Sequence, residues 1–262
     1  MSFPLFVVNK YIRSQNYSFL LSFISIITIS GIALGVTVVL IALSILDGFD
    51  SIISEKIVNF NSHIVISRYG DANLSDNIDI ENKILESNKN MKSVSAFISK
   101  NSIIKSQNFS EGISVLGINP VNNNLEIKKT ILLGNYFNLQ TNKNEIILGR
   151  KLADKIRVKV GDKITLFSLV NNKLPSFSNP PIISQFNIVG IYESGMPEYD
   201  DLKAYIPIKT AKLIFGMDNQ ISGYNVRLNN LSDIESISEK LMDDLRYPYY
   251  VRTIFQQHQN IF

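Results

Sequence analysis

The chain has 262 residues, of which 45% are hydrophobic, and its 26 Lys and Arg against 23 Asp and Glu give a formal net charge of +3. The basic residues are scattered and do not form a patch interleaved with aromatic side chains, so nucleic-acid binding has no support. The sequence contains no cysteine, which excludes disulfides and thiolate metal sites.

The first 18 residues mix aromatic and aliphatic side chains with polar and cationic ones. This pattern is typical of an amphipathic segment that lies in the inner membrane interface. We therefore predict a cytoplasmic amphipathic segment over residues 1–18.

A long apolar run follows, from Phe19 to Leu46, and no charged residue occurs between Arg13 and Asp47. A bilayer core about 30 Å thick needs about 20 apolar residues in a helix. A cleaved signal peptide has a shorter apolar core of about 7–15 residues and ends in an A-x-A-like site. The run lacks both features, so it predicts a retained transmembrane helix over 19–46.

Charges on either side of this run indicate its orientation. Lys10 and Arg13 precede it, whereas Asp47, Asp50 and Glu55 follow it. Because Lys and Arg resist crossing the membrane, the N-terminus is predicted to be cytoplasmic. The about 215 residues after the run are then extracytoplasmic, which is enough for one large domain or two small ones with a real core.

After the run, residues 47–60 keep apolar side chains near helical spacing and predict a helical stalk. Short strands and helices then follow in mixed order, which indicates an α+β domain. Strands are predicted over 63–67, 93–105 with an interruption near Asn101, 111–118, 145–148, 164–169, 186–192 and 222–228. Helices are predicted over 78–87, 149–156, 210–215 and 231–246, the last with a capping box formed by Ser232 and Glu235.

Small residues share one face of the predicted transmembrane helix, namely Thr28, Gly31, Gly35 and Ala42. Gly31 and Gly35 form a G-x-x-x-G motif, which lets two helix backbones approach closely inside a membrane. The alternative is that the glycines are incidental in a lone anchor. Glycine is costly in a helix without a packing reason, so the motif favours a packed helix interface.

The segment 174–184 is rich in proline, which cannot donate a hydrogen bond in a β-ladder. It is predicted to be an exposed loop or hairpin tip. It is the best candidate for contacting a soluble partner, and a plain hairpin tip is the alternative. The candidate contact residues are Lys173, Pro175, Phe177, Pro180, Pro181, Ile182 and Ile183.

Three acidic residues, Glu198, Asp200 and Asp201, form a cluster that suggests paired carboxylates or a calcium site. They follow Gly195–Pro197, however, which favours a solvated turn. The two histidines, His63 and His258, are far apart in the sequence and favour neither a metal site nor a nucleophile–base pair.

Residues that cradle ATP phosphates are missing from the chain. Gly161–Lys163 is followed by Ile164 and lacks the leading glycine of a phosphate-binding loop. We therefore expect no catalytic residue, no cofactor and no metal, and we expect any energy source to be a partner subunit.

Ten stretches spread over nearly the whole chain resemble, in the right order, the lipoprotein-releasing permease family. This family is the LolC/LolE branch of the MacB/FtsX-like ABC transporter permeases. The stretches are Tyr11–Arg13, Ile29–Val36, Leu43–Phe49, His63, Gly117–Pro120, Ile147–Ala153, Val160–Lys163, Val189–Tyr192, Ser194–Asp200 and Ile221–Tyr224. One departure is Asp47, where the family usually has Asn.

The resemblance implies one transmembrane helix followed by a MacB-like two-part periplasmic core domain. It implies a membrane-proximal subdomain formed by residues 61–120 and 218–252, and an inserted subdomain over 121–217. Residues 253–262 would connect to a second transmembrane helix, because family members have three more such helices and a cytoplasmic loop that docks the ATPase. The chain thus resembles the N-terminal portion of a permease.

The resemblance also implies a function and partners. The chain would be a non-enzymatic permease subunit of the bacterial inner membrane that helps to extract lipoproteins from the outer leaflet. Its partners would be an ABC ATPase subunit, a second identical or paralogous permease, the lipoprotein substrate, membrane lipid and a periplasmic lipoprotein chaperone at the Pro-rich loop. The resemblance also favours a subunit-contact loop as the role of the segment that carries Glu198, Asp200 and Asp201.

Two other functions are alternatives to this one. A single-span anchored binding or scaffold protein with an extracytoplasmic α+β domain is the main alternative. A membrane-tethered hydrolase has almost no support from the residues.

Overall fold

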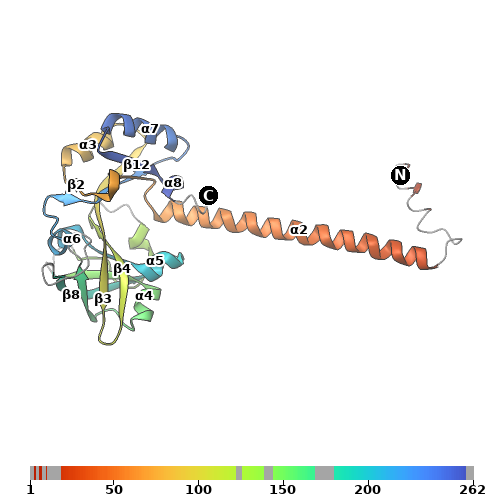
Figure 1. Cartoon of the computed structure of the whole chain (residues 1–262), viewed down its shortest axis with the longest axis horizontal. Helices are drawn as coiled ribbons and strands as arrows, with labels where there is room; N and C mark the ends of the chain where they lie inside the picture. The colour runs from red at the N-terminus through yellow and green to blue at the C-terminus, as the bar shows by residue number, and fades with distance from the viewer. Residues whose placement is uncertain are drawn as a thin grey trace. The chain divides into compact units, whose positions relative to one another are not determined.

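The computed structural model describes residues 3, 6, 7, 10, 19–121, 126–138, 144–168 and 180–257. The chain divides into two compact units, Met1–Glu55 and Lys56–Phe262 (Figure 1). Most of the predicted amphipathic segment 1–18 lies outside the described residues.

Helix α2 runs from Phe19 to Phe60 and so supplies residues to both units. Its segment Phe23–Leu46 has a mean hydropathy of 2.6, and none of that stretch is buried inside the protein. By length and composition this segment is able to cross a membrane.

Six strands of the second unit form a closed ring, which is a small barrel. The ring closes because β7 pairs with both β3 and β8. Within the ring, the strand pairs β4–β9 and β6–β8 are parallel, and the other four strand pairs are antiparallel. In ring order the strands are β3 (Met91–Lys105), β4 (Ser110–Ile118), β9 (Lys203–Pro207), β6 (Glu145–Gly149), β8 (Ile182–Tyr192) and β7 (Lys163–Ser168).

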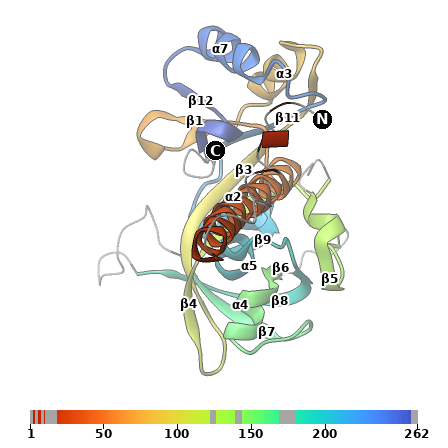
Figure 2. The same cartoon turned by 90° about the vertical axis from the view of Figure 1, so that its right-hand side faces the viewer.

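Strand β3 also leads out of the ring into a second sheet region (Figure 2). Its first half pairs with β11 (Gly223–Leu228), which continues to β1 (Ile64–Arg68) and β12 (Tyr249–Thr253). Helix α3 (Ile78–Glu86) packs on β3, and α7 (Ile234–Leu245) packs on β12. Figure 2 shows these two helices at one end of the unit, and α4 with β7 at the other.

Shorter elements complete the second unit. A buried cluster of apolar side chains, most of them aliphatic, fills the ring, and helices α4 and α6 contribute to it. The remaining elements are η1 (Tyr69–Asp71), β2 (Leu74–Ser75), η2 (Glu126–Thr130), β5 (Ile131–Gly134), α4 (Arg150–Lys155), α5 (Pro197–Leu202), α6 (Ile208–Phe215), β10 (Gln220–Ile221) and α8 (Ile254–Gln257).

The predicted α+β class with one N-terminal apolar helix is confirmed. The interruption predicted near Asn101 is wrong, because Asn101 pairs with Ser114 and the ladder with β4 is continuous there. The subdomain boundaries at 120 and 217 stay a prediction. The ring takes strands from both sides of them.

The predicted capping box of the last long helix is also wrong. Helix α7 starts at Ile234, and its N-cap residue Asp233 makes no side-chain cap hydrogen bond. Glu235 does not reach back to the helix start. Its carboxylate accepts a hydrogen bond from Thr253 Oγ1 at 3.2 Å, so a tertiary contact to β12 has replaced the local one.

Candidate functional site

Strand β6 is buried on both faces, and this creates a site on the outside of the ring. Ile146 and Leu148 belong to the cluster that fills the ring, whereas Ile147 between them belongs to a different cluster. Because side chains alternate along a strand, Ile147 points outward. Tyr205 on the neighbouring strand β9 lies in the same outer cluster. An apolar outer face of this kind needs a cover.

Phe60, the last residue of α2, is part of that cover. Its ring lies edge-on to Tyr199 at a centroid distance of 5.3 Å and is stacked near Tyr192 at 6.2 Å. Tyr192 in turn lies edge-on to Tyr205 at 5.3 Å. We call these four residues the aromatic socket. Each such pair contributes about 0.5–1.5 kcal/mol beyond the burial of area, so the end of α2 is firmly held.

Hydrogen bonds of the tyrosine hydroxyls fix the socket. Tyr199 donates to Asn61 Oδ1 at 2.6 Å, directly after the end of α2. Tyr192 donates to the carbonyl of Tyr199, also at 2.6 Å. Burial raises the pKa of Tyr199 to about 12 and raises the pKa of Tyr192 and of Tyr205 well above the usual value. The phenols are therefore neutral and remain donors.

Asp200 holds the loop that leads into helix α5. Its side chain is buried, with 4% of the residue exposed. Oδ1 accepts hydrogen bonds from the backbone N and from Oγ of Ser194, both at 2.8 Å, and Oδ2 accepts one from the N of Gly195 at 3.2 Å. Gly195 has φ of 74° and would bring a Cβ within 2.9 Å of Lys56 Nζ. We call residues 194–196, which Asp200 holds, the clamped loop. It lies against Lys56, a residue of α2.

Gly149 allows α5 to lie against the end of β6. A Cβ at Gly149 would lie 2.3 Å from the carbonyl oxygen of Asp200. Only glycine permits this approach of two backbones, so the position of the clamped loop depends on it.

Lys203 lies against the Tyr199 ring of the socket. Its Nζ is 3.3 Å from the centroid of the Tyr199 ring, which is a cation–π contact. Burial lowers the pKa of Lys203 to about 8, although the charge of Glu198 acts in the opposite direction. The ammonium is thus held by an aromatic face in a poorly hydrated place.

His63 links the end of α2 to strand β11. Its Nδ1 accepts a hydrogen bond from the N of Leu228 at 3.0 Å, and the ring also hydrogen-bonds the backbone of Val58. Burial and then the charge of Arg227 lower the pKa of His63 to about 4. Arg227 itself donates to the carbonyl of Asn61 at 3.1 Å. The sequence favoured neither a metal site nor a nucleophile–base pair for His63.

The neutral state of His63 predicts a pH dependence of stability. Unfolded His63 takes up a proton below about pH 6.5, whereas folded His63 stays neutral down to about pH 4. The unfolded state therefore binds more protons in this window, and stability falls as the pH drops through it. Allowing for the partial exposure of the ring, we expect His63 to account for a loss of about 1 kcal/mol between about pH 7 and pH 5.

The variant His63→Gln keeps a donor and an acceptor but does not titrate. Urea unfolding of both proteins at several pH values measures the difference between them. The wild type is expected to lose more stability than the variant as the pH falls. Parallel curves for the two proteins would contradict this role.

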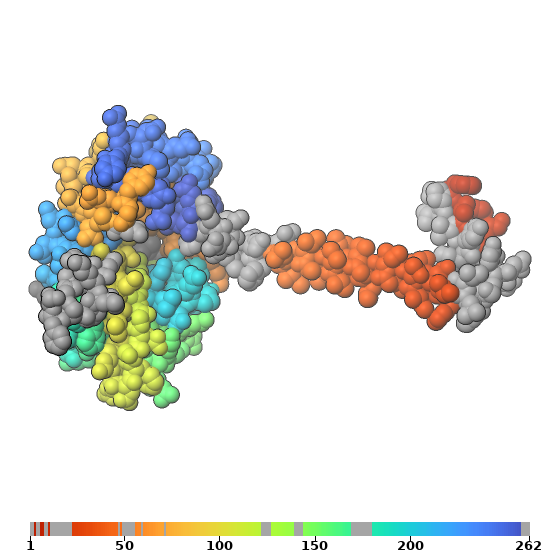
Figure 3. All heavy atoms as spheres, in the orientation of Figure 1, coloured from red at the N-terminus to blue at the C-terminus, as the bar shows by residue number. Residues whose placement is uncertain are grey.

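The three acidic residues of the predicted cluster do not converge. Asp200 turns inward, and Glu198 is exposed. Asp201 lies 3.8 Å from Lys155 Nζ, which also pairs with Glu111 at 3.1 Å. Within the described residues no group of three or more His, Cys, Asp or Glu is able to hold a metal ion. In Figure 3 the cyan atoms around α5 reach the surface, in keeping with the exposure of Glu198.

Comparison with known proteins gives the family. The family model of the MacB-like periplasmic core domain matches residues 25–243. The chain belongs to this family. The resemblance to the lipoprotein-releasing branch is confirmed by relatives named as its transmembrane proteins.

Three of these relatives illustrate the match. The LolC protein of Neisseria meningitidis serogroup B is 26% identical over 241 residues, which cover 90% of this chain and 56% of the relative. LolC of Xylella fastidiosa (strain Temecula1) is 24% identical, covering 97% and 60%. LolE of Haemophilus influenzae is 25% identical, covering 96% and 61%. The chain thus spans a little over half the length of these relatives.

A solved structure has the same fold. The periplasmic region of MacB from Actinobacillus actinomycetemcomitans superposes with a TM-score of 0.51 at 14% identity. The match covers 79% of this chain and 94% of that one. The second unit therefore has the fold of a MacB-like periplasmic core domain.

The other predicted site residues of this family member do not join the socket. Lys173, Pro175 and Phe177 lie outside the described residues, whereas Pro180 and Pro181 immediately precede strand β8. Ile182 and Ile183 begin β8 and pair with Ser168 and Phe167 of β7, and Ile183 is 63% exposed. A role of this loop in binding a partner stays a prediction.

The small-residue face of α2 has open space around it within the chain. A Cβ at Gly31 or at Gly35 would meet no atom within 4 Å. Thr28 Oγ1 donates to the carbonyl of Ile24 at 2.8 Å, so its hydroxyl is satisfied within the helix. Ala42 is exposed as well. This face is free to receive another helix, and its use as an interface stays a prediction.

The socket itself was missed by sequence reasoning. One signal for it was available. Residues 146–148 (Ile-Ile-Leu) and 204–206 (Ala-Tyr-Ile) do not alternate with polar residues, which indicates strands buried on both faces. Which residue covers the outer face, however, depends on a contact between positions more than a hundred residues apart.

Proposed function

We propose that the chain is the N-terminal part of an ABC transporter permease that releases lipoproteins from the inner membrane. Membership of the MacB-like family and the names of the relatives support this function. The structural observation that carries it is the socket. One helix, α2, supplies both the candidate membrane span and the Phe60 side chain that is locked against the ring.

In this proposal the chain transmits force and performs no chemistry. A partner ATPase subunit hydrolyses ATP in the cytoplasm, and movement of α2 is passed through Phe60 and Asn61 to the periplasmic domain. A second permease, identical or paralogous, completes the transporter. The substrate is a lipidated protein in the outer leaflet, and a periplasmic chaperone receives it.

The test is release of a lipoprotein from proteoliposomes. The complete permease that contains this chain is reconstituted with its ATPase subunit and a second permease. We expect the lipoprotein to leave the membrane only when ATP is hydrolysed, and a hydrolysis-deficient ATPase is the control. If the protein assembles with no ATPase at all, the alternative of an anchored scaffold replaces this proposal.

We predict that the N-terminus is cytoplasmic and that the second unit is periplasmic. The chain has no native cysteine, so single thiols report their own position. A cysteine at the exposed Asn101 should react with a membrane-impermeant reagent in cells with a permeable outer membrane, and one at Ser2 should react only after lysis. The reverse labelling pattern would refute the orientation.

We also predict that Gly31 and Gly35 pack against another helix of the transporter. Replacing both with Leu adds bulk where two backbones approach closely and should reduce co-purification of the second permease at least about tenfold, which is about 1.4 kcal/mol. Insertion into the membrane should be unchanged. Leu at Ala33 and Val36, which are exposed on the opposite face of the helix, is the matched control. Equal recovery of the partner with both variants would make the motif incidental.

A further inference from the structure

A groove of about 350 Å³ lies at the end of the second unit where α4 and β7 are found (Figure 2). Three segments line it. They are the turn 106–109 between β3 and β4, residues 156–158 after α4, and Asp162 with Lys163 at the start of β7. The volume is within the usual range of a ligand site, about 300–1,000 Å³.

Arg157 in this groove has a backbone conformation that is unusual for its residue type. Helix α4 ends in a Schellman motif, because the N of Val158 donates to the carbonyl of Ala153 at 3.0 Å and the N of Arg157 donates to that of Asp154 at 3.2 Å. The φ angle of Arg157 is 55°. Glycine is the usual residue at this position, since a side chain is strained in the left-handed region. Because strain of this kind is concentrated at functional sites, it marks Arg157 as a candidate binding residue.

The guanidinium group of Arg157 lies against the turn between β3 and β4. Its Cζ is 4.9 Å from the centroid of the Phe109 ring. In the same turn, Ser106 donates from Oγ to the carbonyl of Ile156 at 2.8 Å, so the turn and the end of α4 are held together. A guanidinium that lies over an aromatic ring keeps the N–H groups at its edge available to a ligand.

The cations that line the groove have no acidic partner. Among the described residues, no ion pair involves Arg157 or Lys163. The lining contains one acid, Asp162, whose Oδ2 accepts a hydrogen bond from the N of Lys159 at 2.8 Å. Two positive charges against one negative charge match a ligand with a single negative charge. A carboxylate carries one such charge, whereas a phosphate monoester carries about 1.5–2.

Charges on the neighbouring residues do not change this balance. Glu111 and Asp201 both contact Lys155, at 3.1 Å and 3.8 Å. Lys159 and Asp154 offset each other. The net positive charge of the groove is therefore that of its own lining.

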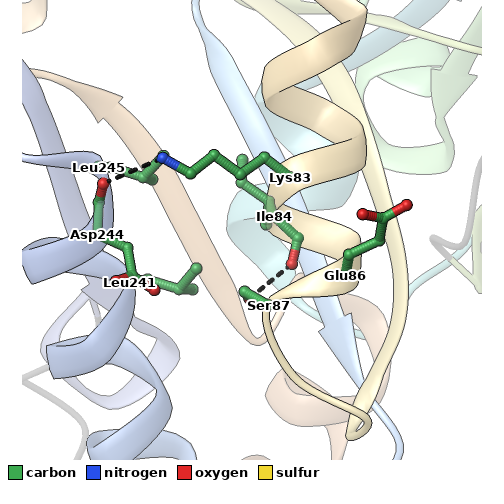
Figure 4. Close-up of a pocket in the computed structure, with 7 residues that line it drawn as sticks. All are labelled: Lys83, Ile84, Glu86, Ser87, Leu241, Asp244 and Leu245. Carbon is green, nitrogen blue, oxygen red and sulfur yellow. Dashed lines mark hydrogen bonds between the residues drawn. The ribbon is translucent and has the colours of Figure 1, made fainter.

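The groove between α3 and α7 differs in this respect. There the ammonium group of Lys83 donates to the carbonyl of Asp244 at 3.4 Å (Figure 4). Lys240 donates to the carbonyl of Ser87 at 3.2 Å. The cations of that groove are thus satisfied within the second unit and offer little to a ligand.

We propose that the groove at Arg157 binds an acidic peptide segment of a partner protein through the carboxylate of an Asp or Glu side chain. The planar fork of the guanidinium would hold the carboxylate with two parallel hydrogen bonds, and Lys163 would add a further contact. The exposed amides of Gln107 and Asn108 would bond the adjoining peptide backbone, since a side-chain amide both donates and accepts. This inference goes beyond the proposed function and does not depend on lipoprotein release.

A blocked peptide tests the proposal on the full chain in a nanodisc of zwitterionic lipid. The probe is a short peptide of Gly and Ser with one central Glu, which carries its only charge. The NMR readout is the methyl signals of Val158, a residue that lines the groove and is 8% exposed. We expect a saturable shift of Val158 with a dissociation constant below about 1 mM, and no shift of Ile66, which is buried in β1.

The variant Arg157→Gly separates binding from stability. It removes the guanidinium and supplies the usual residue of a Schellman motif. Binding should therefore weaken at least about tenfold, while the urea midpoint of unfolding stays the same or rises. Arg246→Gly is the matched control, because among the described residues Arg246 is the other non-glycine with a positive φ, also 55°. It loses the same charge and should bind the peptide as the wild type does.

Four results would overturn the proposal. One is a dissociation constant above about 1 mM, or no saturable shift of Val158 at all. Another is equal binding of a peptide with Gln in place of Glu. A third is an equal loss of affinity in Arg157→Gly and Arg246→Gly, which would indicate a general effect of net charge. The fourth is binding of free succinate as tight as that of the peptide, which would assign the groove to a small dicarboxylate.

Discussion

Replacing Phe60 by alanine is expected to lower the free energy of unfolding of the second unit by about 3–5 kcal/mol, the usual range for a buried Phe. Phe60 is 5% exposed and lies in contact with Tyr192 and Tyr199. Its removal leaves a cavity in the outer cluster, beside the rings of Tyr192 and Tyr199. The chain has 11 Tyr and no Trp, so near-ultraviolet circular dichroism reports the packing of tyrosines during urea unfolding.

A matched variant separates stability from force transmission. Phe215 is also 5% exposed, but it belongs to the cluster inside the ring. Phe215→Ala should cost a similar amount of stability and leave ATP-driven release per folded transporter unchanged. Phe60→Ala should reduce that release strongly while ATP hydrolysis continues. A loss below about 1 kcal/mol for Phe60→Ala, typical of exposed sites, would mean that the socket does not hold α2.

The second large effect is expected at Asp200. Asp200→Ala removes the acceptor of three hydrogen bonds from Ser194 and Gly195. Each hydrogen bond to a charged group contributes about 1.5–3 kcal/mol, and donors left unsatisfied in a buried place add a penalty. Because the freed loop can regain water, we expect a net loss of about 3 kcal/mol. Amide hydrogen exchange at Ser194 and Gly195 should accelerate together with it.

The neighbouring residue Asp201 is the control for this experiment. It lies on the same short helix, and its contact to Lys155 is an exposed ion pair at 3.8 Å. Such pairs contribute at most about 1 kcal/mol, so Asp201→Ala should change stability little. Equal losses of stability at the two positions would show that the hydrogen bonds of Asp200 do not order the loop.

Local patterns predicted most elements of this fold well. The helix over 78–87 and the strand over 145–148 were recognisable because their side-chain spacing is local. The apolar run of α2 was clear for the same reason. These features depend on residues within about two turns of each other, and the sequence displays them directly.

Features that depend on distant contacts were not predictable from the sequence in the same way. Ser232 and Glu235 match a capping box, but Thr253 offers Glu235 a tertiary partner. Asp200 resembles a solvated carboxylate until Ser194 is seen to fold back onto it. The contact of Phe60 with Tyr199 joins residues more than a hundred positions apart in the sequence. For Glu235 and Phe60 a neighbour far along the chain outweighs the local signal, and for Asp200 a loop that folds back over six residues does so.

Strand β3 has a mechanical consequence for the second unit. Its 15 residues extend about 50 Å at the usual rise per residue. Met91–Phe97 pair with β11, and Ser102–Lys105 pair with β7 in the ring. The two ends of this unit therefore share one continuous strand, β3, and are not joined by a flexible hinge there. A torque applied at one end should therefore twist the shared sheet and rotate the other end with it.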